Sequence, residues 1–185
     1  TPNGGTYVEK MKLIDEWIGD LMAEMEKLDI VDNTIVIVMG DNGHATKFSP
    51  QSGFTPMLYR GGKGAVTEGG VRVDAFVRWP GVIEPGRVST EMMHAMDLFP
   101  TFAQIVGGKV PSDRVVDGID MSEFFVGETP KSGRDGFVVY MGNDVFGVKW
   151  KDWKLHFNEQ TGWNGVLRKY TMPRVYNLMN DPAES

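Results

Sequence analysis

Hydrophobic residues recur every three or four positions near the start of the chain, with charged residues between them. Such spacing places the apolar side chains on one face of a helix and predicts an amphipathic helix over residues 7–28. Its apolar positions are Tyr7, Met11, Ile14, Ile18, Leu21, Met25 and Leu28. After a short turn, residues 34–39 are rich in β-branched side chains and lack polar alternation. That run predicts a strand buried on both faces, as in a parallel sheet covered by helices.

Further elements follow at shorter spacing. Residues 71–79 favour a second strand, which a Pro-Gly turn closes. A short helix is expected next, because Asp97 can cap its start and Gly107 can end it. Residues 117–127 predict another short helical piece.

The pattern changes after about residue 130, where short β-prone runs alternate with tight turns and no long helix intervenes. These runs are residues 137–141, 145–150, 153–158 and 174–179. Strands in this arrangement favour an antiparallel sheet. We therefore predict two domains, residues 1–130 and 131–185, with the boundary in the Pro-Lys-Ser-Gly segment at 130–133. Residues 150–154 alternate tryptophan and lysine around a turn, and we expect a hairpin whose aromatic side chains cover a core.

Composition narrows the function classes. The chain has 185 residues, of which 41% are hydrophobic and 24% charged, the ordinary balance of a globular protein. Its net charge of −6 argues against a nucleic-acid binder, which needs a basic surface. No apolar run is long enough to cross a bilayer. The absence of cysteine excludes disulfides and thiol catalysis within this chain.

Two neighbouring segments carry residues suited to a cation and an anion. Asp41 and Asn42 follow the first predicted strand, and such a sequence is either a plain turn or a pair of hard oxygen ligands for Ca²⁺ or Mg²⁺. Lys63 lies in a segment with five glycines, at 61, 62, 64, 69 and 70. It is either a solvated lysine or a point charge on the oxygens of a sulfate or phosphate. A nucleotide-binding P-loop is excluded, because Met57 stands where that motif needs glycine.

The three histidines give less information about acid–base chemistry. His44 follows the Asp-Asn-Gly turn and could reach the same pocket. His94 precedes the predicted helix and His156 lies in a predicted strand, and for both we expect packing or hydrogen-bonding roles.

Taken together, these residues resemble the sulfatase family of the alkaline-phosphatase-like superfamily. The resemblance rests on the order and spacing of six segments: residues 39–43, 60–64, 68–72, 77–83, 94–101 and 175–182. It implies an α/β fold. The chain would be the C-terminal part of an alkaline-phosphatase-like sandwich followed by a small antiparallel sheet with helices.

The resemblance also implies an activity. Members of this family hydrolyse sulfate esters, here of an aryl or carbohydrate alcohol, with a formylglycine nucleophile and a divalent cation, usually Ca²⁺ with Mg²⁺ as the alternative. Asp41 and Asn42 match a pair of metal ligands in the family pattern. Lys63 matches the catalytic lysine that contacts the sulfate and offsets charge in the transition state. His44 falls where the family varies, and we keep it as a substrate-binding candidate.

This chain departs from the family pattern in one decisive respect. The segment C/S-x-P-x-R, which carries the nucleophile, is absent, and so is the earlier pair of aspartates that completes the metal site. Both belong to the N-terminal part of the family, so we expect the missing N-terminal part of the same protein to be a partner. The chain by itself is predicted to be inactive, and its unpaired strands could pair two copies into a homo-oligomer. The resemblance favours a periplasmic or extracellular location, although the sequence itself assigns no compartment.

Two other functions stay open at this point. One is a phosphatase or phosphonate-ester hydrolase of the same superfamily, whose members often place histidine where this chain has Asn42. The other is a non-catalytic module that holds anionic glycans with the Lys63 segment. The leaving-group pocket would be formed by residues 44–56 and 158–172, where Trp163 could stack on a sugar or aryl ring or simply lie at the surface.

Overall fold

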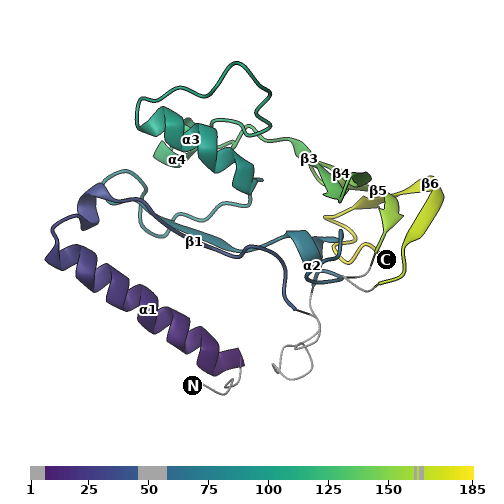
Figure 1. Ribbon diagram of the computed structural model, residues 1–185, viewed down its shortest axis with the longest axis horizontal. Helices are drawn as coiled ribbons and strands as arrows, with labels where there is room; N and C mark the ends of the chain where they lie inside the picture. The colour runs from purple at the N-terminus through teal and green to yellow at the C-terminus, as the bar shows by residue number, and fades with distance from the viewer. Residues whose placement is uncertain (1–6, 46–57, 161, 163–164) are drawn as a thin grey trace.

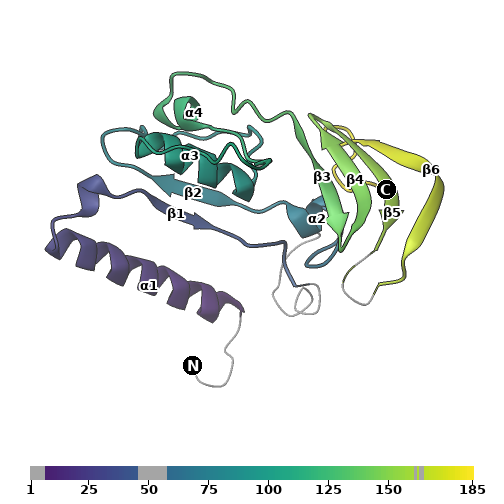
Figure 2. The same cartoon turned by 45° about the horizontal axis from the view of Figure 1, so that its top comes forward.

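The computed structural model describes residues 7–45, 58–160, 162 and 165–185. Its first part contains helices and a two-stranded ribbon: α1 (Tyr7–Lys27), η1 (Val31–Asn33), β1 (Val36–Met39), α2 (Glu68–Val71), β2 (Ala75–Arg78), η3 (Ala95–Asp97), α3 (Leu98–Ile105) and α4 (Ser122–Val126). The second part is a sheet of four strands: β3 (Gly136–Met141), β4 (Asp144–Trp150), β5 (Trp153–Glu159) and β6 (Arg168–Asn177). In two views, α1 and the α3–α4 pair lie on opposite sides of the β1–β2 ribbon (Figures 1 and 2).

The first helix agrees with its predicted bounds, but the first strand differs from its expected setting. β1 pairs with β2 in antiparallel register, Val36 opposite Arg78 and Met39 opposite Ala75. All four β1 residues are half-buried rather than buried on both faces. Within the part of the chain that the structure describes, β2 is the only strand that pairs with β1. An apolar run indicates that a strand is to be covered by other parts of the protein. It does not indicate whether the neighbouring strand runs parallel or antiparallel to it.

The second strand begins later than predicted. Residues 68–71 form the short helix α2, closed by a hydrogen bond of 2.8 Å from the Arg72 N–H to the Glu68 carbonyl oxygen. Extended pairing begins only at Ala75. Gly69 and Gly70 allow this tight turn to pack closely on its neighbours, because a Cβ atom on Gly69 would lie 2.5 Å from the Arg60 carbonyl oxygen.

The predicted helix near residue 97 is present, but Asp97 does not cap α3 with its side chain. Its buried carboxylate instead accepts from the N–H groups of His94 (2.8 Å) and Ile119 (2.9 Å) and pairs with Arg134. The His94 ring in turn accepts from the Met96 N–H at 3.2 Å, which confirms a hydrogen-bonding role for this histidine. Burial, opposed by the nearby Asp97 charge, lowers the pKa of His94.

The antiparallel sheet predicted after residue 130 is confirmed. Its four strands pair in chain order, β3-β4-β5-β6 (Figure 2). One face packs on the segment that leads into α2, where Val66, Val139 and Phe146 form a small buried core. The domain boundary at 130–133 stays a prediction.

The side chains of the hairpin at 150–154 point the opposite way from the prediction, with the tryptophans outward and a lysine inward. Trp150 and Trp153 form a cross-strand pair and remain 53% and 48% exposed, whereas Lys154 is fully buried. Strand alternation requires this result, since Lys149 and Lys154 oppose each other on the inner face. The buried lysine needs a counter-charge, and α2 supplies it.

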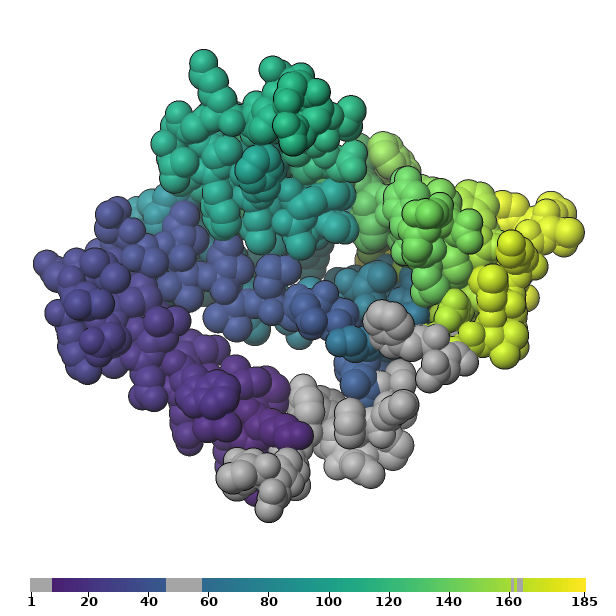
Figure 3. Space-filling view, in the orientation of Figure 1, coloured from purple at the N-terminus to yellow at the C-terminus, as the bar shows by residue number. Residues whose placement is uncertain are grey.

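Much apolar surface stays uncovered. Figure 3 shows open space between α1 and the β1–β2 ribbon. Accordingly, several large apolar side chains of these elements are exposed: Met11, Ile14, Trp17, Leu21 and Phe76. No helix among the described residues is both long and apolar enough to cross a membrane.

Candidate functional site

The Asp-Asn-Gly-His turn (residues 41–44) lies beside residues 60–68, here called the lysine segment, and beside the short helix α2; backbone hydrogen bonds join them. The Lys63 N–H donates to the His44 carbonyl oxygen at 2.7 Å, and the Gly43 N–H donates to the Gly70 carbonyl oxygen at 2.9 Å. The four predicted site residues, Asp41, Asn42, His44 and Lys63, therefore belong to two adjacent backbone segments. The structure thus places the expected cation and anion residues next to each other.

Glycines make this approach sterically feasible. A Cβ atom on Gly43 would lie 1.8 Å from the Gly69 carbonyl oxygen, and one on Gly70 would lie 2.1 Å from the Ala65 carbonyl oxygen. Both distances are far below van der Waals contact, so neither position can hold a larger residue without moving backbone. Gly61 and Gly64, on either side of Lys63, adopt φ values of +86° and +84°, in the left-handed region.

The polar side chains of the site differ in exposure. Lys63 and Asp41 are exposed, while Asn42 and His44 are half-buried. The Asn42 side-chain nitrogen donates to the Gly43 carbonyl oxygen at 2.8 Å. No group of three or more His, Cys, Asp or Glu residues suited to a metal occurs within the described parts of the chain. Asp41 and Asn42 offer a carboxylate and an amide oxygen, the hard oxygen type that Ca²⁺ and Mg²⁺ prefer, and their role as metal ligands stays a prediction.

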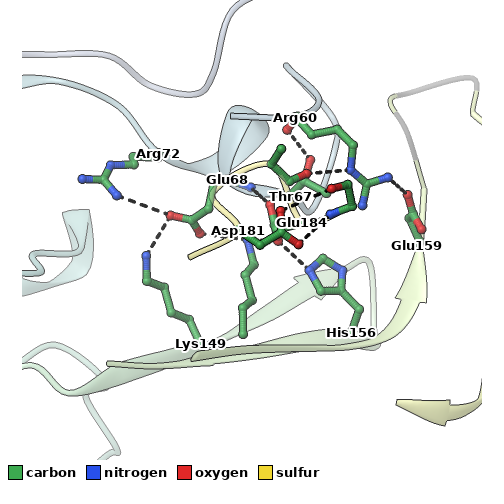
Figure 4. A network of polar contacts seen from close by, with 12 residues as sticks. Arg60, Thr67, Glu68, Arg72, Lys149, His156, Glu159, Asp181 and Glu184 are labelled. Carbon is green, nitrogen blue, oxygen red and sulfur yellow. Dashed lines mark hydrogen bonds and ion pairs between the residues drawn. The ribbon is translucent and has the colours of Figure 1, made fainter. Parts of the chain in front are cut away.

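Behind the lysine segment lies a buried ionic cluster centred on Glu68. Its carboxylate is 2.8 Å from Lys149 Nζ and 2.9 Å from Lys154 Nζ, with Arg72 at 3.8 Å (Figure 4). Burial opposes ionisation of Glu68, but the two lysines outweigh it and hold its pKa below the usual range. This cluster joins α2 to strands β4 and β5.

A second buried carboxylate continues the cluster. Glu184 accepts from the Glu68 backbone N–H at 2.6 Å and lies 3.3 Å from Lys154 Nζ. Its other close partner is His156 Nε2, at 2.7 Å. His156 also packs edge-on against Tyr176, with ring centroids 5.4 Å apart, so its expected hydrogen-bonding and packing role is confirmed.

Arg60 ties the start of the lysine segment to the same sheet. Its guanidinium pairs with Glu159 at 2.5 Å and donates to the Ala183 carbonyl oxygen at 3.0 Å. Glu159 also accepts from the Tyr170 hydroxyl. Burial raises the pKa of Glu159, but the Tyr170 hydrogen bond and the Arg60 charge outweigh it, so the pKa lies below the usual value.

The sequence patterns did not reveal this network. Glu68 appeared only as part of a motif, while Glu159 and Glu184 had no recognisable signal. Lys149 and Lys154 did carry one, because alternation along a hairpin places them on the same face. The pairing of that face with Glu68 depends on a contact across more than eighty residues. Most of the predicted pocket segment 44–56, and Trp163, lie outside the described residues.

The chain is similar to known sulfatases in sequence and in fold. A family model described as Sulfatase matches residues 3–108. The chain is 36% identical to the steryl-sulfatase of Rattus norvegicus, over 97% of this chain and 36% of that protein. It is 34% identical to arylsulfatase D of Homo sapiens, over 98% and 35% respectively.

A solved structure, the PsFucS1 sulfatase from Pseudoalteromonas sp., superposes with a TM-score of 0.84 at 31% identity, over 95% of this chain and 36% of that one. The fold is therefore that of the corresponding part of a sulfatase, as expected for an alkaline-phosphatase-like protein. The chain spans little more than a third of the length of these relatives. With the family model covering more than half of its residues, the chain belongs to the sulfatase family.

Proposed function

We propose that the protein carrying this chain hydrolyses sulfate esters, and that this chain supplies its anion-binding lysine and two of its metal ligands. The observation that carries the proposal is the backbone link between Lys63 and His44 at 2.7 Å. It brings the backbone of an exposed lysine beside the turn that carries Asp41 and Asn42, in a chain of the sulfatase family. The names of the relatives, steryl-sulfatase and arylsulfatase, support the same ester class.

Lys63 has the role of holding the sulfate oxygens. Its ammonium is carried by an exposed side chain, on a segment whose backbone is shaped by glycines and adjoined by buried ion pairs. Charge that develops on the sulfate in the transition state is stabilised by such a preorganised cation, typically by about 10²–10³-fold in kcat. His44 lies at the adjacent turn and is the candidate for a further contact to the substrate.

The cation proposed for Asp41 and Asn42 is Ca²⁺, with Mg²⁺ as the alternative, because carboxylate and amide oxygens suit both. When bound, the cation supplies positive charge that polarises the ester's sulfate group. The remaining ligands and the formylglycine nucleophile belong to the N-terminal part of the protein, the partner that we propose for this chain. No cysteine is present to become formylglycine, and no serine has proline and arginine at the family's offsets. The chain alone is therefore proposed to be inactive.

The test compares the complete protein with the isolated chain, using 4-methylumbelliferyl sulfate and the matching phosphate. The complete protein should cleave the sulfate in preference to the phosphate, and the isolated chain should cleave neither. Lys63→Ala should lower kcat in the complete protein by about 10²–10³-fold. The control is Lys109→Ala, at an exposed lysine away from the site, which should leave activity unchanged.

Preference for the phosphate would favour the related phosphatase function. Anionic-glycan binding without turnover of either ester would favour a non-catalytic module.

A further inference from the structure

The turn that contains Glu184 has an unusual backbone conformation for a residue that is not glycine. Glu184 is fully buried, and its φ of 55° lies in the left-handed region that residues with a side chain seldom adopt. Such a conformation persists only where the surroundings fix it. Asp181 holds the turn by accepting the Ser185 N–H at 2.9 Å, while its carbonyl oxygen accepts the Glu184 N–H at 3.2 Å.

This turn touches the lysine segment at both of its ends. On the far side of Lys63, the Glu184 carboxylate accepts from the Glu68 N–H at 2.6 Å. On the near side, the Ala183 carbonyl oxygen accepts from Arg60 Nε at 3.0 Å. The two ends are themselves joined, because the Arg60 carbonyl oxygen accepts the Thr67 hydroxyl at 2.6 Å.

The carboxylate of Glu184 is itself fixed by partners from the sheet. Lys154 Nζ lies 3.3 Å away and His156 Nε2 lies 2.7 Å away, and both partners are buried. A buried carboxylate with three partners has little freedom, so it transmits the position of β5 to the start of α2. Its contact to Glu68 is to a backbone N–H, which sets the path of the main chain directly.

From this geometry we propose that Glu184 is a positioning residue for Lys63: it holds the lysine segment so that the ammonium meets the sulfate in the productive place. The proposal rests on the function proposed above. It differs from a purely stabilising role, because the effect of Glu184 on turnover would pass through Lys63. Misplacement of a catalytic group by about 1 Å can cost about 10²-fold in rate.

The test is a double-mutant cycle in the complete protein with 4-methylumbelliferyl sulfate. Glu184→Gln keeps the shape of the side chain and removes its charge. It should lower kcat by about 10-fold or more and change KM far less, since Lys63 acts chiefly on charge in the transition state. In a Lys63→Ala background the same substitution should have almost no further effect. Glu128→Gln, at an exposed glutamate, is the matched control and should change neither constant.

The outcomes separate the two proposals. If Lys63→Ala leaves turnover unchanged, the proposed role of Lys63 fails, and the role of Glu184 fails with it. If Lys63→Ala lowers turnover but Glu184→Gln has equal effects in both backgrounds, only the positioning role is overturned. Should Glu184→Gln not give folded protein, Asp181→Ala carries the same cycle, because it loosens the turn at a half-buried residue. Equal effects of Asp181→Ala in the two backgrounds would likewise overturn the positioning role.

Discussion

Lys154 and Glu68 form a buried ion pair, with Nζ 2.9 Å from Oε1 and both side chains almost completely shielded from solvent. The pair joins strand β5 to the helix that follows the lysine segment. Burying such charges is costly unless each is paired, and here Lys149 and Glu184 complete the set. The position of the candidate site in this chain thus depends on charges that are almost completely buried.

Removing the Glu68 charge should therefore destabilise the protein strongly. Glu68→Gln leaves Lys154 without its closest charged partner, and breaking a buried pair typically costs about 3–5 kcal/mol. The measurement is urea denaturation of the complete protein, followed by tryptophan fluorescence. The control is Glu24→Gln, which breaks the exposed Glu24–Lys27 pair and should cost less than about 1 kcal/mol. If the two variants lost similar amounts of unfolding free energy, the buried pair would not stabilise the protein more than the exposed pair does.

The same cluster predicts a pH dependence of stability. The folded-state pKa of Glu68 lies below its usual value of 4.5, so its ionised form is favoured in the folded protein. This contribution is present above the unfolded-state pKa and is lost as pH falls through the lower, folded-state pKa. Urea midpoints measured from about pH 7 to pH 3 should fall mainly below about pH 4.5. Glu68→Gln should flatten that fall, whereas an unchanged pH profile in this variant would exclude Glu68 as its source.

Part of this molecule follows from its sequence and part does not. The period of apolar residues in α1 and the short runs of β3 to β5 are local signals, and they predicted those elements well. For β6 the predicted bounds were wrong, because the strand begins at Arg168, six residues before the predicted run at 174–179 and inside the expected pocket segment 158–172. The adjacency of Asp41 and Lys63 was predictable only through the family resemblance, since no local pattern links two segments about twenty residues apart. The buried position of Lys154 was missed because a lysine is seldom buried, and its partner Glu68 is distant in the chain. The left-handed turn at Glu184 was missed because no glycine marks it.

The close packing of the two site segments predicts a severe effect of one added methyl group. Gly43→Ala would place a Cβ atom 1.8 Å from the Gly69 carbonyl oxygen, which forces the two segments apart. We expect loss of most sulfatase activity in the complete protein and a lower melting temperature. Gly19→Ala is the matched control, because its Cβ would meet nothing within 4 Å on helix α1. That change should stabilise the protein by about 0.5–1 kcal/mol, and a Gly43→Ala protein with full activity would show that the segments tolerate separation.

Cation binding should depend on residues outside this chain. In the proposed site Asp41 and Asn42 would supply two oxygen ligands, while Ca²⁺ takes six to eight. The isolated chain should therefore bind Ca²⁺ no more tightly than about 10⁻³ M by calorimetry, and the complete protein should bind it more tightly. Asp41→Asn should weaken binding in the complete protein, whereas Asp20→Asn on helix α1 should not. Tight binding by the isolated chain would mean that its own residues complete the site.

The uncovered apolar side chains predict that the isolated chain associates with itself. Trp17 and Leu21 on α1 are 60% and 53% exposed, and Phe76 on β2 is 70% exposed. Apolar surface of this kind favours burial against another chain, and the edges of a two-stranded ribbon can pair in the same way. Sedimentation velocity should show concentration-dependent oligomers of the isolated chain. The double variant Trp17→Glu and Leu21→Glu should reduce them, whereas Lys10→Glu and Lys12→Glu, also on α1, should not. We propose that the N-terminal part of the complete protein covers these residues, and we therefore expect no such association there. Equal association of both proteins would contradict that cover.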